Sequence, residues 1–238
     1  MITDSGVKLV NLETKISSLR LNNPLILASG IMDEDAGSMK RIFKNGAGGI
    51  VTKSIGLKPR EGYANPTLVE LEHGILNAMG LPNPGIKEFK QEVKELKKYK
   101  IPVIGSIFAS KPKEFERLAK KMEKYGTEAV ELNLSCPHAK GFGLEIGSDR
   151  VLVNKIVKNV KNRIEIPVFV KISPNLTNIV EIARSIENGK ADGIVAINTV
   201  KAMKIDIDTK LPVLANKIGG YAGSAIKPIG VRCVYEIS

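Results

Sequence analysis

Residues 102–133 read PVIGSIFASKPKEFERLAKKMEKYGTEAVELN, and this stretch contains the unit from which the fold is built. Two short apolar runs, 102–107 and 129–132, flank a segment with helical spacing over 112–125. Such runs are typical of parallel strands buried on both faces, and Pro112 suits the first position of a helix. The stretch therefore predicts a strand, a helix and a second strand joined by a right-handed crossover.

The same unit recurs along the chain. Further apolar runs are expected to form strands at 25–28, 49–54, 167–172 and 193–198. Helices are predicted over 36–44, up to about residue 98, and over 149–161 and 178–188, and another follows Gly223. Residues 10–21 alternate polar and apolar side chains around Ser17 and Ser18, which predicts an N-terminal β-hairpin. The segments 55–84 and 199–223 are expected to be irregular.

Six strand–helix units in succession indicate an α/β fold. The first strand is not followed by a Gly-x-Gly-x-x-Gly motif, so the pattern favours a (β/α)8 TIM barrel over a dinucleotide-binding sheet. We expect residues 1–238 to form a single barrel domain with the N-terminal β-hairpin. A full barrel has eight units, so the last two β/α units are expected to be absent from this chain.

The formal net charge is +11, which has two interpretations. It could mark a surface for nucleic acid or an anionic ligand, or a solvated exterior rich in lysine. Lysines alternate with glutamates at helical spacing, as in 88–98 and 114–124, which favours the second interpretation. Cys136 and Cys233 are far apart without metal-ligand spacing, and no apolar stretch reaches the ~18 residues of a membrane helix. We therefore expect a cytoplasmic protein that binds no metal, nucleic acid or membrane.

Polar side chains follow nearly every predicted strand. In a barrel the active site lies where the strands end, so these side chains are expected to converge. Each has a simpler explanation alone, because a lysine can reach solvent and a serine or asparagine can form a turn. Two lysines in one cavity would repel unless an anion lies between them, so the pattern predicts an anionic ligand. The residues are Ser29, Lys53, Ser54, Ser106, Asn133, Lys171, Asn198 and Thr199.

Two loop segments complete the candidate site. The stretch 133–138, Asn-Leu-Ser-Cys-Pro-His, places the thiol of Cys136 directly after a predicted buried strand. A lone cysteine is more often a small buried residue than a reactive one, so position alone decides nothing. Residues 77–85, Asn-Ala-Met-Gly-Leu-Pro-Asn-Pro-Gly, suit a loop close to a flat ligand, although a plain surface loop fits equally well.

Taken in order, these motifs resemble the dihydroorotate dehydrogenases, and in particular the catalytic subunit of their NAD-linked class. The resemblance extends from Val10 to the end of the chain. It implies an FMN-binding barrel that oxidises dihydroorotate to orotate in pyrimidine biosynthesis. The matching segments are 77–81, 133–137, 171–175, 197–199, 214–216 and 219–220.

The resemblance also implies residue roles. Cys136 would be the catalytic base that removes the C5 proton while hydride passes to FMN. Lys53 would pair with the substrate carboxylate and touch the flavin, and Lys171 would stabilise the negative charge of the reduced ring. Substrate contacts are further implied for Asn77, Ala78, Met79, Gly80, Leu81, Asn133, Asn198 and Thr199. Cofactor contacts are further implied for Ser29, Ser54, Ser106, Asn133, Ile197 and Gly223.

A partner is implied as well. Enzymes similar to this chain work with a subunit that carries FAD and a 2Fe–2S cluster and passes electrons to NAD, in a heterotetramer built on a homodimer. Two distant cysteines cannot supply the four thiolates of such a cluster, so those cofactors would belong to the partner.

Other interpretations remain open at this point. His138 stands where many family members have asparagine and has no assigned role, and Cys-Pro-His also occurs in dihydropyrimidine dehydrogenase. A pyrimidine reductase of that kind, an FMN barrel similar to tRNA-dihydrouridine synthase and a non-catalytic truncated scaffold are the alternatives.

Overall fold

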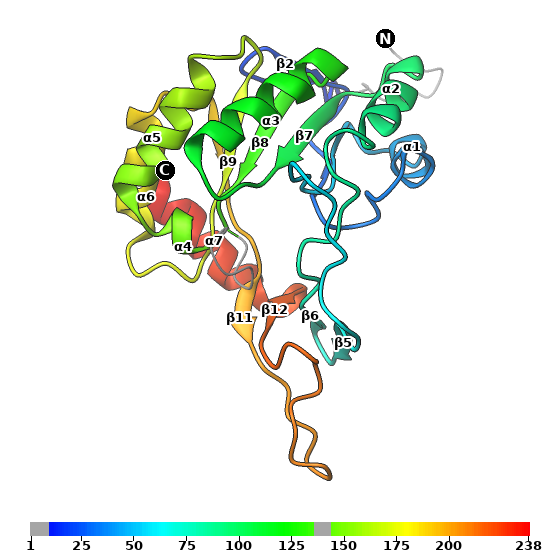
Figure 1. Cartoon of the computed structure of the whole chain (residues 1–238), viewed down its shortest axis with the longest axis vertical. Helices are drawn as coiled ribbons and strands as arrows, with labels where there is room; N and C mark the ends of the chain where they lie inside the picture. The colour runs from blue at the N-terminus through cyan, green and yellow to red at the C-terminus, as the bar shows by residue number, and fades with distance from the viewer. Residues whose placement is uncertain (1–9, 136–143) are drawn as a thin grey trace.

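The computed structural model describes residues 10–135 and 144–238. Its centre is a parallel sheet of six strands in the order β3-β4-β7-β8-β9-β10, so neighbours in the sheet follow one another along the chain. Helices cover its outer face (Figure 1). Among the described residues the sheet is open, with β3 and β10 at its edges. The strands are β3 (Ile26–Leu27), β4 (Gly49–Val51), β7 (Val103–Ile107), β8 (Ala129–Asn133), β9 (Val168–Lys171) and β10 (Gly193–Val195).

The predicted helices are confirmed, and the sequence explains where they begin. Asp35 accepts a hydrogen bond of 2.8 Å from the amide of Ser38 at the start of α1, and Asp149 and Asn178 cap α5 and α6 in the same way. The third helix begins at Pro112, as predicted. The helices are α1 (Ala36–Lys44), α2 (Lys90–Lys98), α3 (Pro112–Tyr125), α4 (Leu144–Gly147), α5 (Arg150–Lys161), α6 (Ile179–Asn188), the 3-10 turn η1 (Ser224–Ile226) and α7 (Lys227–Ile237).

The two faces of the sheet are buried in different ways. On the outer face, Val130 and Leu132 of β8 belong to the large apolar cluster that also contains Phe115 and Met122 of α3. On the inner face, Ala129 belongs to a smaller cluster, with Val51, Ile104, Phe169 and the hairpin side chains Leu19 and Leu21. Because side chains alternate between the faces of a strand, this division decides which residues point into the barrel.

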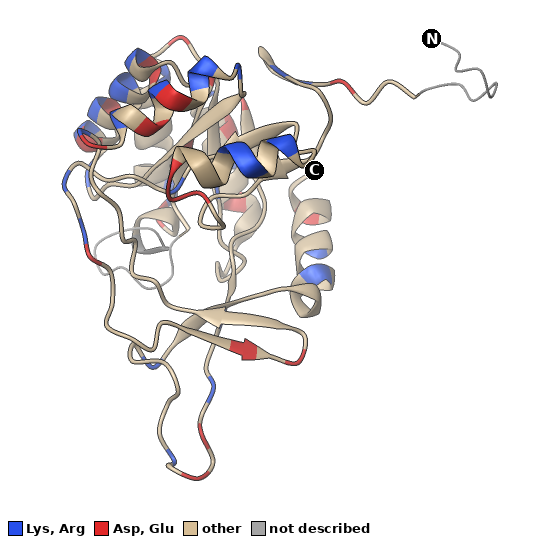
Figure 2. Ribbon diagram, turned by 90° about the vertical axis from the view of Figure 1, so that its right-hand side faces the viewer, with Lys and Arg blue, Asp and Glu red and all other residues tan. Residues whose placement is uncertain are grey.

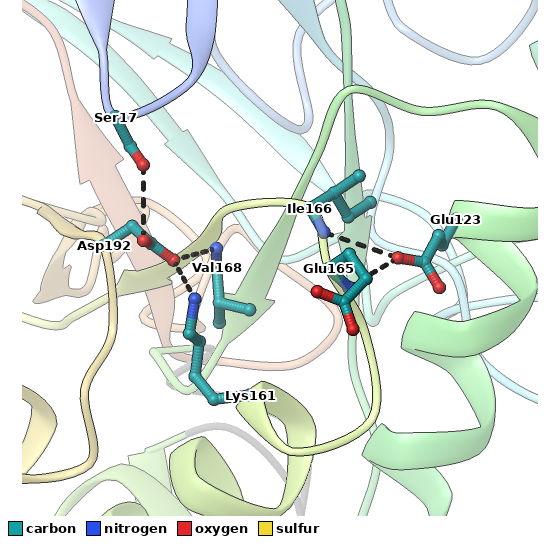
Figure 3. Close-up of polar contacts among 7 residues, drawn as sticks. All are labelled: Ser17, Glu123, Lys161, Glu165, Ile166, Val168 and Asp192. Atoms are coloured by element: carbon teal, nitrogen blue, oxygen red, sulfur yellow. Dashed lines mark hydrogen bonds and ion pairs between the residues drawn. The ribbon is translucent and has the colours of Figure 1, made fainter.

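The N-terminal hairpin covers the end of the barrel where the strands begin. It consists of β1 (Thr14–Ile16) and β2 (Leu19–Leu21), which pair antiparallel as predicted. Asp192 links the hairpin to the barrel, accepting from the Ser17 hydroxyl at 3.3 Å, the Lys161 ammonium at 2.7 Å and the Val168 amide at 2.8 Å (Figure 3). The hairpin therefore closes the end opposite the predicted site.

The segments expected to be irregular contain a second sheet, which corrects that prediction. Four short strands pair antiparallel in the order β11-β12-β6-β5, beyond the end of the parallel strands (Figure 1). The pairing of β6 with β12 aligns Asn77 with Gly220, residues far apart in the sequence. Strands this short show no recognisable alternation of polar and apolar residues. They are stabilised by pairing with segments distant in the sequence, which local sequence does not reveal. The strands are β5 (Leu68–Leu71), β6 (Gly74–Asn77), β11 (Val200–Ala202) and β12 (Gly219–Ala222).

Charged residues are spread over the exterior. Lys and Arg are interspersed with Asp and Glu along the outer helices (Figure 2). Several form ion pairs there, such as Lys98 with Glu95 and Arg232 with Glu236. This distribution supports the solvated exterior expected from the sequence. In the described residues, none of the helices has the length and apolar character needed to cross a membrane.

Candidate active site

The inward-facing positions change from apolar to polar toward the ends of the strands. On β7, Ile104 is followed two residues later by Ser106, and on β9 Phe169 is followed by Lys171. On β8, Ala129 is followed by Glu131 and then Asn133. Residues two apart on a strand share a face, so these polar groups lie above the apolar inner cluster. The polar groups of the parallel strands therefore lie together at one end of the barrel.

These strand ends surround a cavity of about 280 Å3. The antiparallel sheet and its loops form the opposite wall, and side chains from both sheets line the space. Twelve of the residues predicted for the site line the cavity: Ser29, Lys53, Ser54, Asn77, Met79, Gly80, Leu81, Asn133, Lys171, Ile197, Asn198 and Thr199.

Three predicted residues do not line the cavity, and one cannot be placed. Ala78 is buried in the small core of the antiparallel sheet. Ser106 is fully buried behind Ser54. Gly223 follows Ala222, which does line the cavity, and has a left-handed backbone with φ +123°. Cys136, the predicted catalytic base, and His138 fall outside the described residues.

A chain of hydroxyl groups crosses the sheet beneath the cavity. Ser29 Oγ lies 3.3 Å from Ser54 Oγ, which lies 2.9 Å from Ser106 Oγ. Ser106 in turn donates to Glu131 Oε1 at 3.1 Å. Asn133 Nδ2 also donates to Ser54 Oγ at 2.8 Å. The chain thus joins the cavity lining to a carboxyl group buried in the barrel.

Amide side chains organise the wall formed by the ends of the parallel strands. Asn133 Oδ1 accepts from the Ser135 hydroxyl at 3.0 Å, and that hydroxyl accepts from Asn198 Nδ2 at 2.8 Å. Asn198 Oδ1 accepts from the Thr199 amide at 2.7 Å. Since each side chain is held by its neighbour, the lining has defined orientations before any ligand binds.

The two cavity lysines have different surroundings. The Lys53 ammonium is 3.1 Å from Glu34 Oε1, and the Glu34 side chain is 69% exposed. Lys171 is only 8% exposed, and its ammonium forms no hydrogen bond or ion pair with any part of the chain that the structure describes. The carboxylate of Glu34 therefore already reduces the predicted repulsion between the ammonium groups of Lys53 and Lys171.

Two buried carboxyl groups lie close to these lysines, and neither was predicted from the sequence. Burial raises the pKa of Glu131, and the charge of Lys171 and the Ser106 hydrogen bond oppose the increase. Burial also raises the pKa of Asp33, which accepts from the Gly30 amide at 2.6 Å. The other oxygen of Asp33 has no hydrogen-bond partner among the described residues. A signal for Glu131 existed, since it lies two residues before Asn133 in an otherwise apolar run.

The loop after β6 forms a rigid part of the cavity rim. Arg60 Nε donates to the Gly80 carbonyl at 2.6 Å, and the Tyr63 amide donates to the Met79 carbonyl at 3.0 Å. Gly80 has φ +77°, and a Cβ atom there would lie 2.8 Å from the Tyr63 ring. Only glycine suits this backbone and this space, so the close approach of the loop depends on Gly80.

The family model described as dihydroorotate dehydrogenase matches residues 11–238. A relative from Thermoplasma acidophilum is 54% identical over 229 residues, which cover 96% of this chain and 76% of the relative. One from Methanocaldococcus jannaschii is 50% identical over 230 residues, with 95% and 75% covered. Both are named dihydroorotate dehydrogenase B (NAD(+)), catalytic subunit.

A solved structure has a similar fold. The ligand-free dihydroorotate dehydrogenase from Eimeria tenella superimposes with a TM-score of 0.81 at 20% identity. The match covers 95% of this chain and 72% of the other. This likeness supports the barrel architecture, whereas the family assignment rests on the sequence matches.

Proposed function

The chain belongs to the dihydroorotate dehydrogenase family, and from that premise we propose that it oxidises dihydroorotate to orotate in pyrimidine biosynthesis, with FMN as electron acceptor. The observation that carries the proposal is the convergence on one cavity of two lysines and three amide side chains. An anionic pyrimidine needs a cation for its carboxylate and amides for its alternating N–H and C=O groups. Those amides belong to Asn77, Asn133 and Asn198.

The cavity fits FMN on the same chemical grounds. Lys171 presents a nearly buried positive charge that none of the described residues neutralises by direct contact, which suits a cofactor that gains negative charge. Ser29 and Ser54 provide hydroxyl groups, and Met79, Leu81 and Ile226 provide apolar surface for a flat ring. FMN would accept the electrons of the reaction when bound.

The residues of the chain would then orient the substrate. Lys53 would exchange Glu34 for the substrate carboxylate, and the Asn133–Ser135–Asn198 network would hold the ring. We assign the removal of the C5 proton to Cys136, which follows Ser135 in the sequence. A thiol is a workable base near neutral pH when its surroundings favour thiolate, as a neighbouring cation does.

The name of the relatives includes the words catalytic subunit, and we propose that this chain likewise works with a second subunit. That partner would carry FAD and a 2Fe–2S cluster and pass electrons to NAD, in a heterotetramer built on a homodimer. In the described residues there is no group of three or more His, Cys, Asp or Glu placed to hold a metal ion.

The experiment that tests the function is a flavin assay. Purified protein should bind FMN, and dihydroorotate should bleach the flavin absorbance whereas dihydrouracil should not. Selective bleaching distinguishes a carboxylated substrate from an uncharged one, which is the role given to Lys53. Protein that cannot be reconstituted with FMN, or that reacts equally with both compounds, contradicts the proposal.

A further inference from the structure

Glu131 is a buried acid for which the proposed mechanism has no role. Its residue is 1% exposed, and its side chain lines a second, mostly apolar cavity of about 200 Å3 inside the barrel. Lys171 lines both this inner cavity and the ligand cavity above it. Glu131 therefore lies below Lys171, away from the ligand, on the same inner face of the sheet.

The charged groups near Glu131 act in opposite directions. Lys171, on the neighbouring strand β9, favours the ionised carboxylate. Burial among apolar side chains such as Ile104 and Phe169 disfavours it, and so does the negative charge of Asp33. Among the described residues, these are the charged groups that act on Glu131. The pKa of such a carboxyl group shifts when a charge next to it changes, so its protonation can follow that charge.

The serine chain provides a path for a proton. An ionised carboxylate only accepts hydrogen bonds, so Ser106 must donate to Glu131, and Ser54 can then donate to Ser106. Asn133 donates to Ser54, and Ser29 can do the same, which completes one consistent orientation toward the carboxylate. A protonated Glu131 would reverse it, because the carboxyl group would then donate to Ser106. Serine hydroxyls rotate freely enough to adopt either order.

We propose that Glu131 is the proton-accepting counter-charge of Lys171. It is ionised while the ligand cavity holds no extra negative charge, and it takes up one proton when negative charge appears beside Lys171. The proton comes from solvent through the cavity, along Ser29, Ser54 and Ser106, and forms an O–H bond on the carboxylate. No electrons move in this step. The inference deepens the proposed function, on which it rests for the source of the negative charge.

The first test uses apoprotein and is therefore independent of FMN. Lys171→Met removes the cation, so Glu131 should become protonated at pH 7. Infrared difference spectroscopy should then show a protonated carboxyl band in Lys171→Met that is missing in the double variant Lys171→Met/Glu131→Gln. Wild-type protein should lack this band at pH 7. A Glu131 band already present in wild type, or none in the Lys171 variant, overturns the proposal.

The second test uses the FMN-loaded protein and counts protons. Two electrons and one proton leave the bound flavin with one negative charge, so a second proton on Glu131 should restore neutrality. The flavin midpoint potential should therefore change with pH. In wild type the slope should correspond to two protons per two electrons, and in Glu131→Gln to one proton per two electrons. One proton in wild type, or equal counts in both proteins, overturns the proposal.

Asp33→Asn is the matched control. Asp33 is also a buried carboxyl group with a raised pKa near the lysines, but no hydrogen bond joins it to the serine chain among the described residues. The flavin midpoint potential of Asp33→Asn should keep the pH dependence of two protons per two electrons. A decrease to one proton in this variant would assign the proton uptake to Asp33 and overturn the role of Glu131. Protein that binds no FMN contradicts the proposed function, while the infrared measurement still decides the inference.

Discussion

Replacing Lys53 tests the proposed carboxylate contact most directly. Lys53→Met keeps the length and apolar stem of the side chain and removes its charge. A hydrogen bond to a charged group contributes about 1.5–3 kcal/mol, of which the exchange of Glu34 offsets roughly 0–1 kcal/mol, because Glu34 is mostly exposed. The net loss is about 0.5–3 kcal/mol, so the Kd for orotate should increase roughly two- to a hundredfold, at tenfold per 1.4 kcal/mol.

The measurement is a titration of FMN-loaded protein with orotate and with uracil, followed by flavin absorbance. Uracil has no carboxylate, so its Kd should change by less than about threefold in the Lys53 variant. Equal losses for the two ligands would mean that Lys53 supports the cavity without recognising the carboxylate, and would refute the reasoning.

Glu34→Gln is the control, because it removes the outer partner of Lys53 and leaves the ammonium in place. A surface ion pair contributes about 0–1 kcal/mol, so the Kd for orotate should stay the same or decrease by up to about fivefold. Weaker orotate binding in this variant would show that Glu34 positions Lys53 for the ligand instead of competing with it.

Three further outcomes are expected. Cys136→Ala should retain FMN and lose turnover, and activity kept at neutral pH, measured by orotate formation, would contradict its role as base. Gly220→Ala should lower the free energy of unfolding in urea by about 1–3 kcal/mol and weaken orotate binding, because the added methyl group overlaps the Thr199 side chain. Burial raises the pKa of Glu131 above 4.5, so the folded wild type binds this proton more tightly than the unfolded chain and gains stability as the pH falls through the raised pKa. In urea unfolding, the free energy of unfolding of wild type should therefore increase relative to that of Glu131→Gln as the pH falls from 7 to 4.5. A difference between the two proteins that stays constant over this range would argue against the raised pKa.

The sequence predicted the elements whose signals are local. The helices predicted over 36–44, 149–161 and 178–188 begin beside the capping residues Asp35, Asp149 and Asn178, and another begins at Pro112 as predicted. These positions depend on the few residues that follow them, so an isolated stretch contains the information. The order of the parallel strands followed as well, because each apolar run pairs with the next one along the chain.

The antiparallel sheet could not be predicted in the same way. Its strands have three or four residues each, and β12 begins with Gly219 and Gly220. Nothing local in such a sequence favours a strand, and the pairing of Asn77 with Gly220 becomes visible only when the barrel brings them together. Residues of both walls were predicted, since Asn77, Met79 and Leu81 also line the cavity, but the antiparallel sheet that positions the second wall was not.

The charge balance of the cavity shows where the reasoning from sequence was incomplete. Two lysines in one cavity suggested an anionic ligand, because two buried cations repel. The structure places carboxyl groups of its own near them, with Glu34 beside Lys53 and Glu131 beneath Lys171. The lysines alone therefore do not require an anion.

The two carboxyl groups near the lysines differ in their exposure to water. Glu34 is exposed, and water can solvate its charge when Lys53 turns to a ligand. Glu131 is buried and has no such compensation, so its attraction for the charge of Lys171 is lost only when the carboxyl group becomes neutral. Because the Ser29–Ser54–Ser106 chain leads to Glu131, a proton can reach it without opening the core. We therefore expect negative ligand charge beside Lys171 to be accompanied by proton uptake at Glu131. Negative ligand charge beside Lys53 should cause no such uptake.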